Sequence, residues 1–363
     1  MSKKSKSIYS ILILLATFFF LAPEAHASVT TNPTFELDPS NVNSFNPAST
    51  STVYDLVSNR SIIGTNSGVS YSNVNGGIFD TFTVSPGTGF WFAPAAVGHA
   101  TNPSGSMTLE TWVKFTSWNA TWNIFATRWF TNLSGSGVPS DFHFAVKSAN
   151  NDGLNQRLNL FTTSTSDIYG SQVINLNTWY LLAFTINNST QEQKFYINGQ
   201  QDGSTTTGVT RTANTSNYLF VGDPRTGCVA CSFNGQMARF RLWNSALSSA
   251  QMLSNFRSEG AAFGYSTTTS LSAAVSPNPS YRTTNLITAT VSKPGKVTFY
   301  QQGVVIPGCK NRTAVSTTAT CSWKPSQRGK VSVTASLTPT DLGFVPSTGA
   351  LNFQVLNRSG ARN

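Results

Sequence analysis

The segment Leu109-Glu110-Thr111-Trp112-Val113-Lys114-Phe115 decides the fold class, because it is a short run rich in β-branched and aromatic side chains. Such side chains are enriched in strands, so the run predicts a β-strand. Many short strands separated by turns are typical of a β-sandwich. Similar runs recur at residues 179–186, 195–197, 218–221 and 238–243.

Turn-forming pairs separate these runs and support the strand prediction. A single short helix is expected after the last run, because Ser248-Ser249-Ala250-Gln251 fits a capping box flanked by a hydrophobic staple of Leu247 and Met252. This helix should end by Gly260. The turn signals are Asn75-Gly76-Gly77, Asn198-Gly199, Asp202-Gly203 and Asn234-Gly235.

A second set of strands follows a linker-like stretch of Ser and Thr at residues 266–270. We therefore predict two sandwich domains, residues 28–265 and 266–357, followed by a C-terminal tail at 358–363. The runs of the second domain are residues 286–291, 296–300, 318–323, 330–337 and 351–356.

Residues 1–27 have the pattern of a secretory signal peptide, with three lysines, an apolar run at 11–22 and the cleavage site Ala25-His26-Ala27. As a helix the apolar run would reach about 18 Å, which is short of the roughly 30 Å bilayer core. We expect a secreted protein, extracellular or at the cell surface, with no membrane span after signal cleavage. An uncleaved anchor is the alternative.

Positive charge is concentrated at the C-terminal end of the chain. The 363 residues contain 24 Lys+Arg and 14 Asp+Glu, a net charge of +10, but residues 268–363 hold ten Lys/Arg and only Asp341 as an acid. Such basicity attracts anionic surface polymers, although it also serves solubility. No nucleic-acid motif accompanies it, so we expect no specific nucleic-acid partner.

The four cysteines should form disulfides, since an exported chain meets an oxidising compartment. The domain boundary near residue 266 separates them two and two, which favours the pairs Cys309–Cys321 and Cys228–Cys231. Pairing within Cys228-Val229-Ala230-Cys231 stays open, and a zinc site formed by all four is the alternative.

The first domain resembles laminin-G-like, concanavalin A-like jelly-roll domains of secreted bacterial proteins over residues 33–257. The second resembles bacterial immunoglobulin-like repeats, through Gly295-Lys296-Val297-Thr298-Phe299-Tyr300 and Ala319-Thr320-Cys321-Ser322-Trp323. The resemblance implies an all-β chain, a jelly-roll β-sandwich plus an immunoglobulin-like sandwich. The matching motifs of the first domain include Phe35-Glu36-Leu37-Asp38, Thr108-Leu109-Glu110-Thr111-Trp112-Val113, Trp179-Tyr180-Leu181-Leu182-Ala183-Phe184, Phe195-Tyr196-Ile197-Asn198-Gly199 and Arg241-Leu242-Trp243-Asn244.

The first resemblance also implies a carbohydrate or protein ligand on the sandwich surface, often with bound calcium. Sugar rings stack on aromatic side chains, and their hydroxyls need polar partners. Candidate ligand-binding residues are therefore Trp118, Trp122, Arg128 and Trp129, then Asn150-Asn151-Asp152 and Tyr169 in loop-like surroundings. The alternatives are core packing for each Trp and a simple turn at 150–152.

One calcium ion is the only cofactor expected, since calcium prefers carboxylate and carbonyl oxygens. Asp55, Asp80 and Asp223 each lie next to turn-like sequence and could contribute ligands. Structural capping is the alternative role for each of them.

The sequence argues against catalysis. Glycoside hydrolysis needs two carboxylates about 5–10 Å apart, whereas Glu110 stands alone on its strand and the pair Glu36/Asp38 fits a structural first strand. His143, between two phenylalanines, reads as a strand residue. We expect a secreted, non-catalytic carbohydrate-binding or adhesion protein, whose jelly roll binds a glycan or cell-surface component and is presented by the immunoglobulin-like domain. The alternative is a structural or assembly component of an envelope or appendage.

Overall fold

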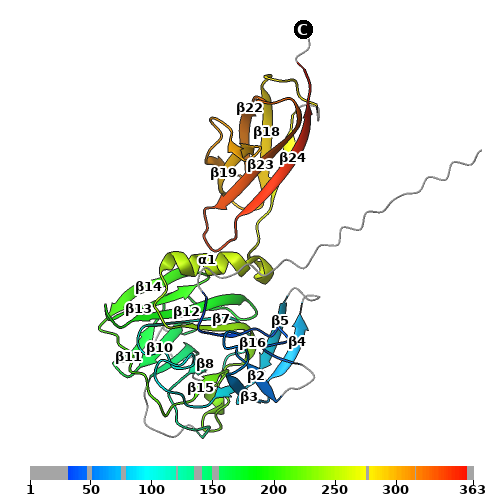
Figure 1. The fold of residues 1–363 in the computed structure, drawn as a ribbon. Helices are drawn as coiled ribbons and strands as arrows, with labels where there is room; N and C mark the ends of the chain where they lie inside the picture. The colour runs from blue at the N-terminus through cyan, green and yellow to red at the C-terminus, as the bar shows by residue number, and fades with distance from the viewer. Residues whose placement is uncertain are drawn as a thin grey trace, which may run out of the picture.

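A computed structural model describes residues 32–46, 51–74, 79–119, 122–134, 141–148, 155–274, 278–314 and 316–357. The predicted signal peptide and the C-terminal tail lie outside these residues. The described chain is almost entirely strands, arranged as two β-sandwiches with a short helix between them (Figure 1). The predicted all-β class is confirmed. No helix in the described ranges is long and apolar enough to cross a membrane.

The N-terminal sandwich consists of two antiparallel sheets. The first sheet has the order β14-β13-β12-β7-β16-β5-β4, with β1 also paired to β16. Its strands are β1 (Phe35–Leu37), β4 (Ser70–Val74), β5 (Phe79–Val84), β7 (Met107–Phe115), β12 (Trp179–Asn187), β13 (Glu192–Ile197), β14 (Gln200–Thr207) and β16 (Gly235–Trp243).

The second sheet has the order β11-β10-β9-β8-β15-β6-β3-β2. Its strands are β2 (Thr52–Tyr54), β3 (Ile63–Ser67), β6 (Gly89–Phe92), β8 (Trp122–Thr127), β9 (Phe142–Lys147), β10 (Leu158–Thr162), β11 (Thr165–Tyr169) and β15 (Leu219–Val221).

The main core lies between these sheets and follows the two-residue period of the strands. On β9, Phe142, Phe144 and Val146 are fully buried in this core. The residues between them, His143 and Ala145, therefore lie on the outer face of the second sheet. That outer face carries the pocket described below.

Helix α1 (Ser249–Glu259) covers the outer face of the first sheet, and it starts with the predicted capping box at Ser248 and Gln251. Phe256 packs on Trp112 of β7, with ring centroids 5.9 Å apart. The turn between β13 and β14 lies directly under the helix. An added Cβ at Gly199 would sit 2.7 Å from the Leu253 Cα, and the φ of Gly199 is +74°, so this position requires glycine.

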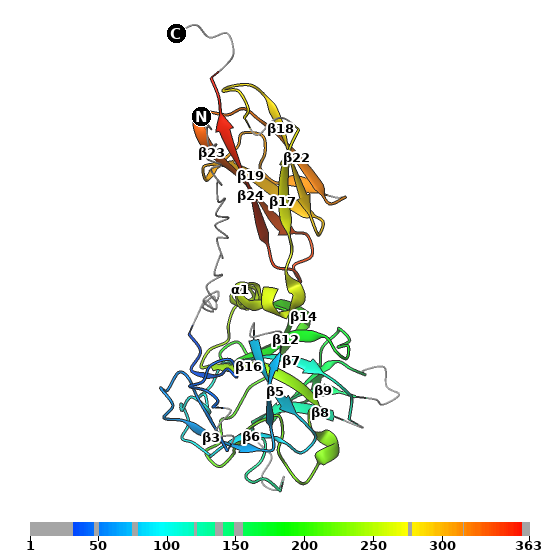
Figure 2. The same ribbon diagram turned by 90° about the vertical axis from the view of Figure 1, so that its right-hand side faces the viewer.

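Charged side chains are buried between α1 and the first sheet. Arg241 of β16 pairs with Glu259 of α1, with Glu110 at 3.1 Å and with Glu36 at 2.7 Å. The Trp112 Nε1 donates a hydrogen bond to Glu259 at 2.7 Å. Glu36 and Glu110 thus contribute to the attachment of α1 through Arg241. Figure 2 shows α1 on the side of the sandwich opposite the second sheet.

The C-terminal sandwich follows η3 (Ala261–Tyr265). Where the two sandwiches meet, the Val345 N–H donates to the Tyr265 carbonyl at 2.8 Å. One sheet contains β17 (Thr269–Ala273), β18 (Asn285–Val291) and β22 (Thr318–Trp323); the other contains β19 (Gly295–Gln301), β20 (Val304–Val305), β21 (Arg312–Ala314), β23 (Gly329–Pro339) and β24 (Ser347–Val355).

Two disulfides are present, Cys228–Cys231 beside the short helix η2 (Val229–Cys231) and Cys309–Cys321 in the C-terminal sandwich. Both are compatible with an oxidising, extracellular location. Cys321 lies on β22 and is buried in the core with Trp323. The second disulfide therefore ties the loop after β20 to the opposite sheet.

Removing the Cys309–Cys321 disulfide with the double substitution Cys309→Ala and Cys321→Ala should destabilise the C-terminal sandwich by about 3 kcal/mol, because the bond closes a loop in the unfolded chain. The two cysteines are 12 positions apart. Differential scanning calorimetry would measure the change. The matched change at Cys228 and Cys231, only 3 positions apart, should cost less, and the opposite ranking would contradict the loop-closure argument.

Candidate ligand-binding site

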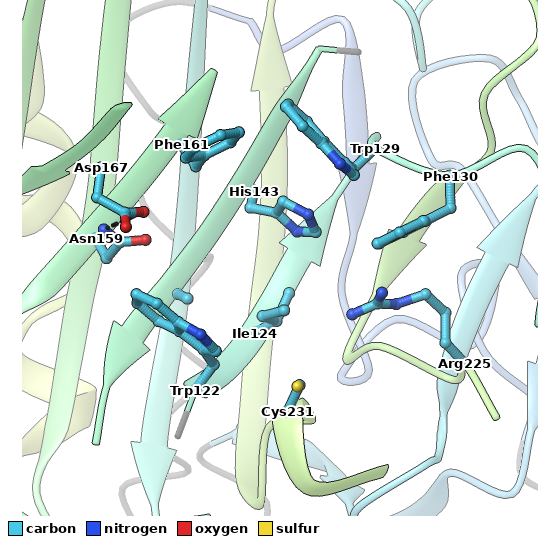
Figure 3. A pocket seen from close by; sticks show the side chains of 11 residues that line it. Trp122, Ile124, Trp129, Phe130, His143, Asn159, Phe161, Asp167, Arg225 and Cys231 are labelled. Carbon is cyan, nitrogen blue, oxygen red and sulfur yellow. Dashed lines mark hydrogen bonds between the residues drawn. The ribbon is translucent and has the colours of Figure 1, made fainter. Parts of the chain in front are cut away.

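A pocket of about 400 Å³ opens on the outer face of the second sheet, the side of the sandwich away from α1. Its floor is formed by β8, β9 and β10, with the end of β11 and the loops after β8 and β15 as walls (Figure 3). The lining residues are Trp122, Ile124, Trp129, Phe130, His143, Ala145, Asn159, Phe161, Asp167, Arg225 and Cys231.

Aromatic rings form most of the pocket wall. The Trp129 ring lies 5.0 Å from the His143 ring and 4.8 Å from the Phe161 ring, centroid to centroid. Phe130 is 5.2 Å from His143 on the other side. Because each ring is held by its neighbours, the pocket presents a fixed apolar surface to a ligand.

Polar groups lie at opposite ends of this aromatic wall. At one end, Asn159 Nδ2 donates to the exposed carboxylate of Asp167 at 3.2 Å. At the other end, the Arg225 guanidinium lies 3.8 Å from the centre of the Phe130 ring. Its Nη2 donates to Asp223 Oδ2 at 2.6 Å, so this buried ion pair holds the guanidinium in place.

His143 lies at the centre of the pocket (Figure 3) and is neutral at physiological pH. Burial, reinforced by the positive charge of Arg225, lowers the pKa of its imidazole to about 3. The Nδ1 atom is buried and has no hydrogen-bond partner among the described residues. Buried polar atoms usually have a partner, so this nitrogen is an unsatisfied polar group in an otherwise aromatic part of the pocket.

Three of the sequence-predicted ligand residues lie in or beside the pocket. Trp122 and Trp129 line it. Tyr169 is adjacent, because the Lys147 ammonium lies 5.1 Å from the Tyr169 ring centre and 5.9 Å from that of Trp122. The predicted segment Asn150-Asn151-Asp152 lies outside the described residues.

Two of the predicted ligand-binding residues, Arg128 and Trp118, do not line the pocket. Arg128 is fully buried, and its guanidinium donates to Asp141 and to the backbone carbonyls of Thr101 and Asn214, so it is a structural residue. Trp118 packs against the main core, 4.9 Å from the Phe115 ring. Both residues lie near Trp122 or Trp129 in the sequence, but their side chains point into the interior and do not face the pocket.

The three aspartates proposed for calcium do not come together. No group of three or more His, Cys, Asp or Glu side chains suited to a metal occurs in the described part of the chain. Asp55 accepts backbone N–H groups, from Glu36 and Ser58 at 2.7 Å each, and Asp223 is held by Arg225. Asp80 accepts from the Tyr71 hydroxyl. These three aspartates therefore do not form one shared calcium site, and a bound calcium ion stays a prediction.

Sequence reasoning missed most of the polar pocket, including His143, Asn159, Asp167 and Arg225. The alternation of β9 and β10 already places His143, Asn159 and Phe161 on the face opposite the core. Alternation of this kind only shows that a side chain faces outward, which is true of many residues in a sandwich. The pairing of β9 with β8 and β10 is what makes these outward-facing residues the floor of a pocket.

Residues 86–252 match the Laminin_G_3 family of the concanavalin A-like lectin/glucanases superfamily. The matched region begins just before β6 and ends within α1, so it includes every residue that lines the pocket. This part of the chain is a domain of that superfamily. The immunoglobulin-like character of the C-terminal sandwich stays a prediction. No curated protein matches the sequence.

Several solved structures are similar in fold. A Trypanosoma rangeli sialidase bound to the inhibitor DANA shares 15% identity with a TM-score of 0.46, covering 65% of this chain but only 34% of the sialidase. Domain 4 of AbnA, a GH43 extracellular arabinanase from Geobacillus stearothermophilus bound to arabinotriose, shares 17% identity with a TM-score of 0.43, covering 61% of this chain and 96% of that domain. A heptameric SAP-like pentraxin from Limulus polyphemus shares 18% identity with a TM-score of 0.32, covering 40% of this chain and 67% of the pentraxin chain.

These comparisons contradict the predicted function, a secreted, non-catalytic carbohydrate-binding or adhesion protein. The matched superfamily groups lectins with glucanases. A match to it therefore gives no basis for calling the protein non-catalytic. The spacing of carboxylates in the sequence was therefore not sufficient ground for excluding catalysis.

Proposed function

We propose that the pocket on the second sheet binds a saccharide unit. The observation that carries this proposal is the combination of a fixed aromatic wall with the unpartnered Nδ1 of His143 at its centre. Small-molecule sites are typically apolar clefts with a few convergent polar groups. A sugar ring matches this pattern, because it has an apolar C–H face and a rim of hydroxyls.

Each part of the pocket has a defined role in this proposal. The sugar ring stacks on Trp122 or Trp129, whose indoles supply rigid contact area. A neutral imidazole offers one donor and one acceptor nitrogen, so His143 bonds a hydroxyl through Nδ1. The exposed Asp167 accepts from a second hydroxyl. The volume of about 400 Å³ falls in the range of small-molecule sites.

Trp122→Ala should weaken saccharide binding at least about tenfold, the effect of losing an aromatic contact that contributes about 1.4 kcal/mol. A glycan-array screen of the purified protein would identify a saccharide, and isothermal titration calorimetry would measure its Kd for both proteins. Reducing-end release in the same samples distinguishes binding from hydrolysis.

Trp91→Ala is the matched control. Trp91 is half-buried on β6 of the same sheet, where it packs 5.5 Å from the Tyr218 ring, and it does not line the pocket. This variant should retain the affinity of the unmodified protein. Equal affinities for Trp122→Ala and Trp91→Ala, or no binding to any glycan by folded protein, would refute a saccharide site in this pocket.

A further inference from the structure

The end of the C-terminal sandwich farthest from the N-terminal sandwich carries exposed basic side chains. Arg282 lies just before β18, Lys324 just after β22, and Arg328 and Lys330 lie before and at the start of β23. We call Arg282, Lys324, Arg328 and Lys330 the distal basic cluster. Figures 1 and 2 show this end beside the last residues of β24, well away from α1.

Two arginines of the distal basic cluster share one aromatic ring. The Arg282 Cζ lies 5.2 Å from the centre of the Tyr281 ring, and the Arg328 Cζ lies 4.9 Å from it. The two guanidiniums are therefore separated by no more than the sum of these distances. This upper limit of about 10 Å is one Debye length at 0.1 M ionic strength, so each charge adds to the field of the other.

Within the described residues, no carboxylate side chain forms an ion pair with these basic groups. Asp341 is the only acidic residue after position 267. Asp341 belongs to the turn between β23 and β24, where its carboxylate accepts the Gly343 N–H at 2.8 Å. This turn also contains Val345, whose N–H donates to the Tyr265 carbonyl, so it lies at the end of the sandwich opposite the distal basic cluster. Among the described residues, no ion pair occurs in the C-terminal sandwich.

A cavity of about 580 Å³ opens beside the distal basic cluster. Lys324 lines it, together with the amide and hydroxyl side chains of Gln302, Ser322, Ser326 and Gln327 and the apolar side chains of residues 304–307. The cavity and the arginines are joined through the backbone, because the Arg282 N–H donates to the Pro325 carbonyl and the Gln302 side chain donates to the Lys330 carbonyl.

We propose that this end of the C-terminal sandwich binds an anionic polysaccharide. The arginines and lysines attract carboxylate or sulfate groups, and the amides and hydroxyls of the cavity bond the sugar hydroxyls between them. Nucleic acid fits less well, since base stacking needs exposed aromatic faces, whereas Trp323 is fully buried and the Tyr281 ring already has two guanidiniums beside it.

The test compares two variants that lose the same charge. Binding of the full-length protein to polygalacturonate and to heparin is measured by affinity electrophoresis at low and high salt. The double variant Arg282→Gln/Arg328→Gln should bind at least about tenfold more weakly. Lys293→Gln/Lys296→Gln removes two charges at the opposite end of the sandwich and should change binding less than about threefold.

Three outcomes would overturn the proposal: equal weakening by both double variants, no binding to either polysaccharide, or tighter binding to a single-stranded DNA oligonucleotide than to both polysaccharides. The proposed pocket on the second sheet is tested separately. Trp122→Ala should leave binding to polygalacturonate and heparin unchanged, and a loss there would assign that binding to the pocket and also overturn the proposal.

Discussion

Asp141→Asn is expected to lower the free energy of unfolding by about 3–5 kcal/mol, because it leaves two buried guanidiniums without a counter-charge. The Asp141 carboxylate is fully buried and accepts from Arg128 Nε at 2.9 Å and from Arg211 Nη2 at 2.8 Å. Both arginines have fully buried side chains. The backbone of Asp141 has a φ of 95°, a region in which Asn is among the better tolerated residues, so the loss of charge dominates.

Chemical denaturation followed by circular dichroism would measure this change. Asp341→Asn removes an exposed carboxylate that is in no ion pair among the described residues, and it should shift stability by less than about 0.5 kcal/mol. A loss of under 1 kcal/mol for Asp141→Asn would show that the buried cluster is not needed for stability.

This ion cluster also places the pocket. Arg128 directly precedes Trp129, and Asp141 precedes β9, which carries His143. The same guanidinium of Arg128 donates to Thr101 and Asn214, so the cluster connects loops on several sides. The predicted ligand residue Arg128 thus contributes to the site by holding its walls, without contacting a ligand.

Glu110→Gln should flatten the pH dependence of stability between about pH 4.5 and 7. Burial under α1 raises the pKa of Glu110 to about 7, although the positive charge of Arg241 opposes this rise. In the unfolded chain the same group titrates near 4.5. The folded state therefore holds a proton that the unfolded state has lost, and stability falls as pH rises through this window, by up to about 3 kcal/mol.

Glu259 acts in the opposite direction at lower pH. Burial alone would raise its pKa, but Arg241 and Arg239 hold the value at about 2. Its contribution is present above about pH 4.5 and is lost as pH falls toward 2. His143 also gains a proton in acid, but it is present in both the unmodified protein and the Glu110→Gln variant, so its effect cancels when the two are compared. The difference between the two proteins at pH 5 and at pH 8 therefore isolates Glu110.

Urea denaturation at these two pH values checks the Glu110 prediction. The unmodified protein should lose more stability between pH 5 and 8 than Glu110→Gln does. Parallel pH profiles would contradict a raised pKa at Glu110. Glu192→Gln is a suitable control, because Glu192 is a partly exposed residue in a 3.6 Å pair with Lys194 and should leave the profile unchanged.

Local features of the fold could be predicted from the sequence. The strand around Trp112, the helix beginning after Ser248 and the turn at Asn198-Gly199 all occur where expected. Each depends on neighbours within a few residues, through strand propensity, capping or a left-handed turn conformation. The concentration of positive charge in residues 268–363 is likewise a property of composition alone.

The candidate site could be predicted only in part, because its residues come from separate elements. Trp122 and Trp129 stood out as tryptophans among polar neighbours, a signal that also selected Trp118 and Arg128, which the structure places against or within the interior. In the sequence, Glu110 stands alone on its strand and Glu36 pairs only with Asp38, yet both Glu36 and Glu110 meet Arg241 in the structure. Pairing of distant strands created that cluster.

The sequence by itself determined the strands around Trp112 and Trp179, the helix after Ser248, the turn at Asn198-Gly199 and the basic C-terminal end, since these follow from short-range preferences and from composition. Only the tertiary structure decided which outward-facing side chains share a pocket. His143 on β9, Asn159 on β10 and Arg225 after β15 are far apart along the chain. They meet because strand register and sheet order bring them together, and both depend on long-range contacts that no local pattern records.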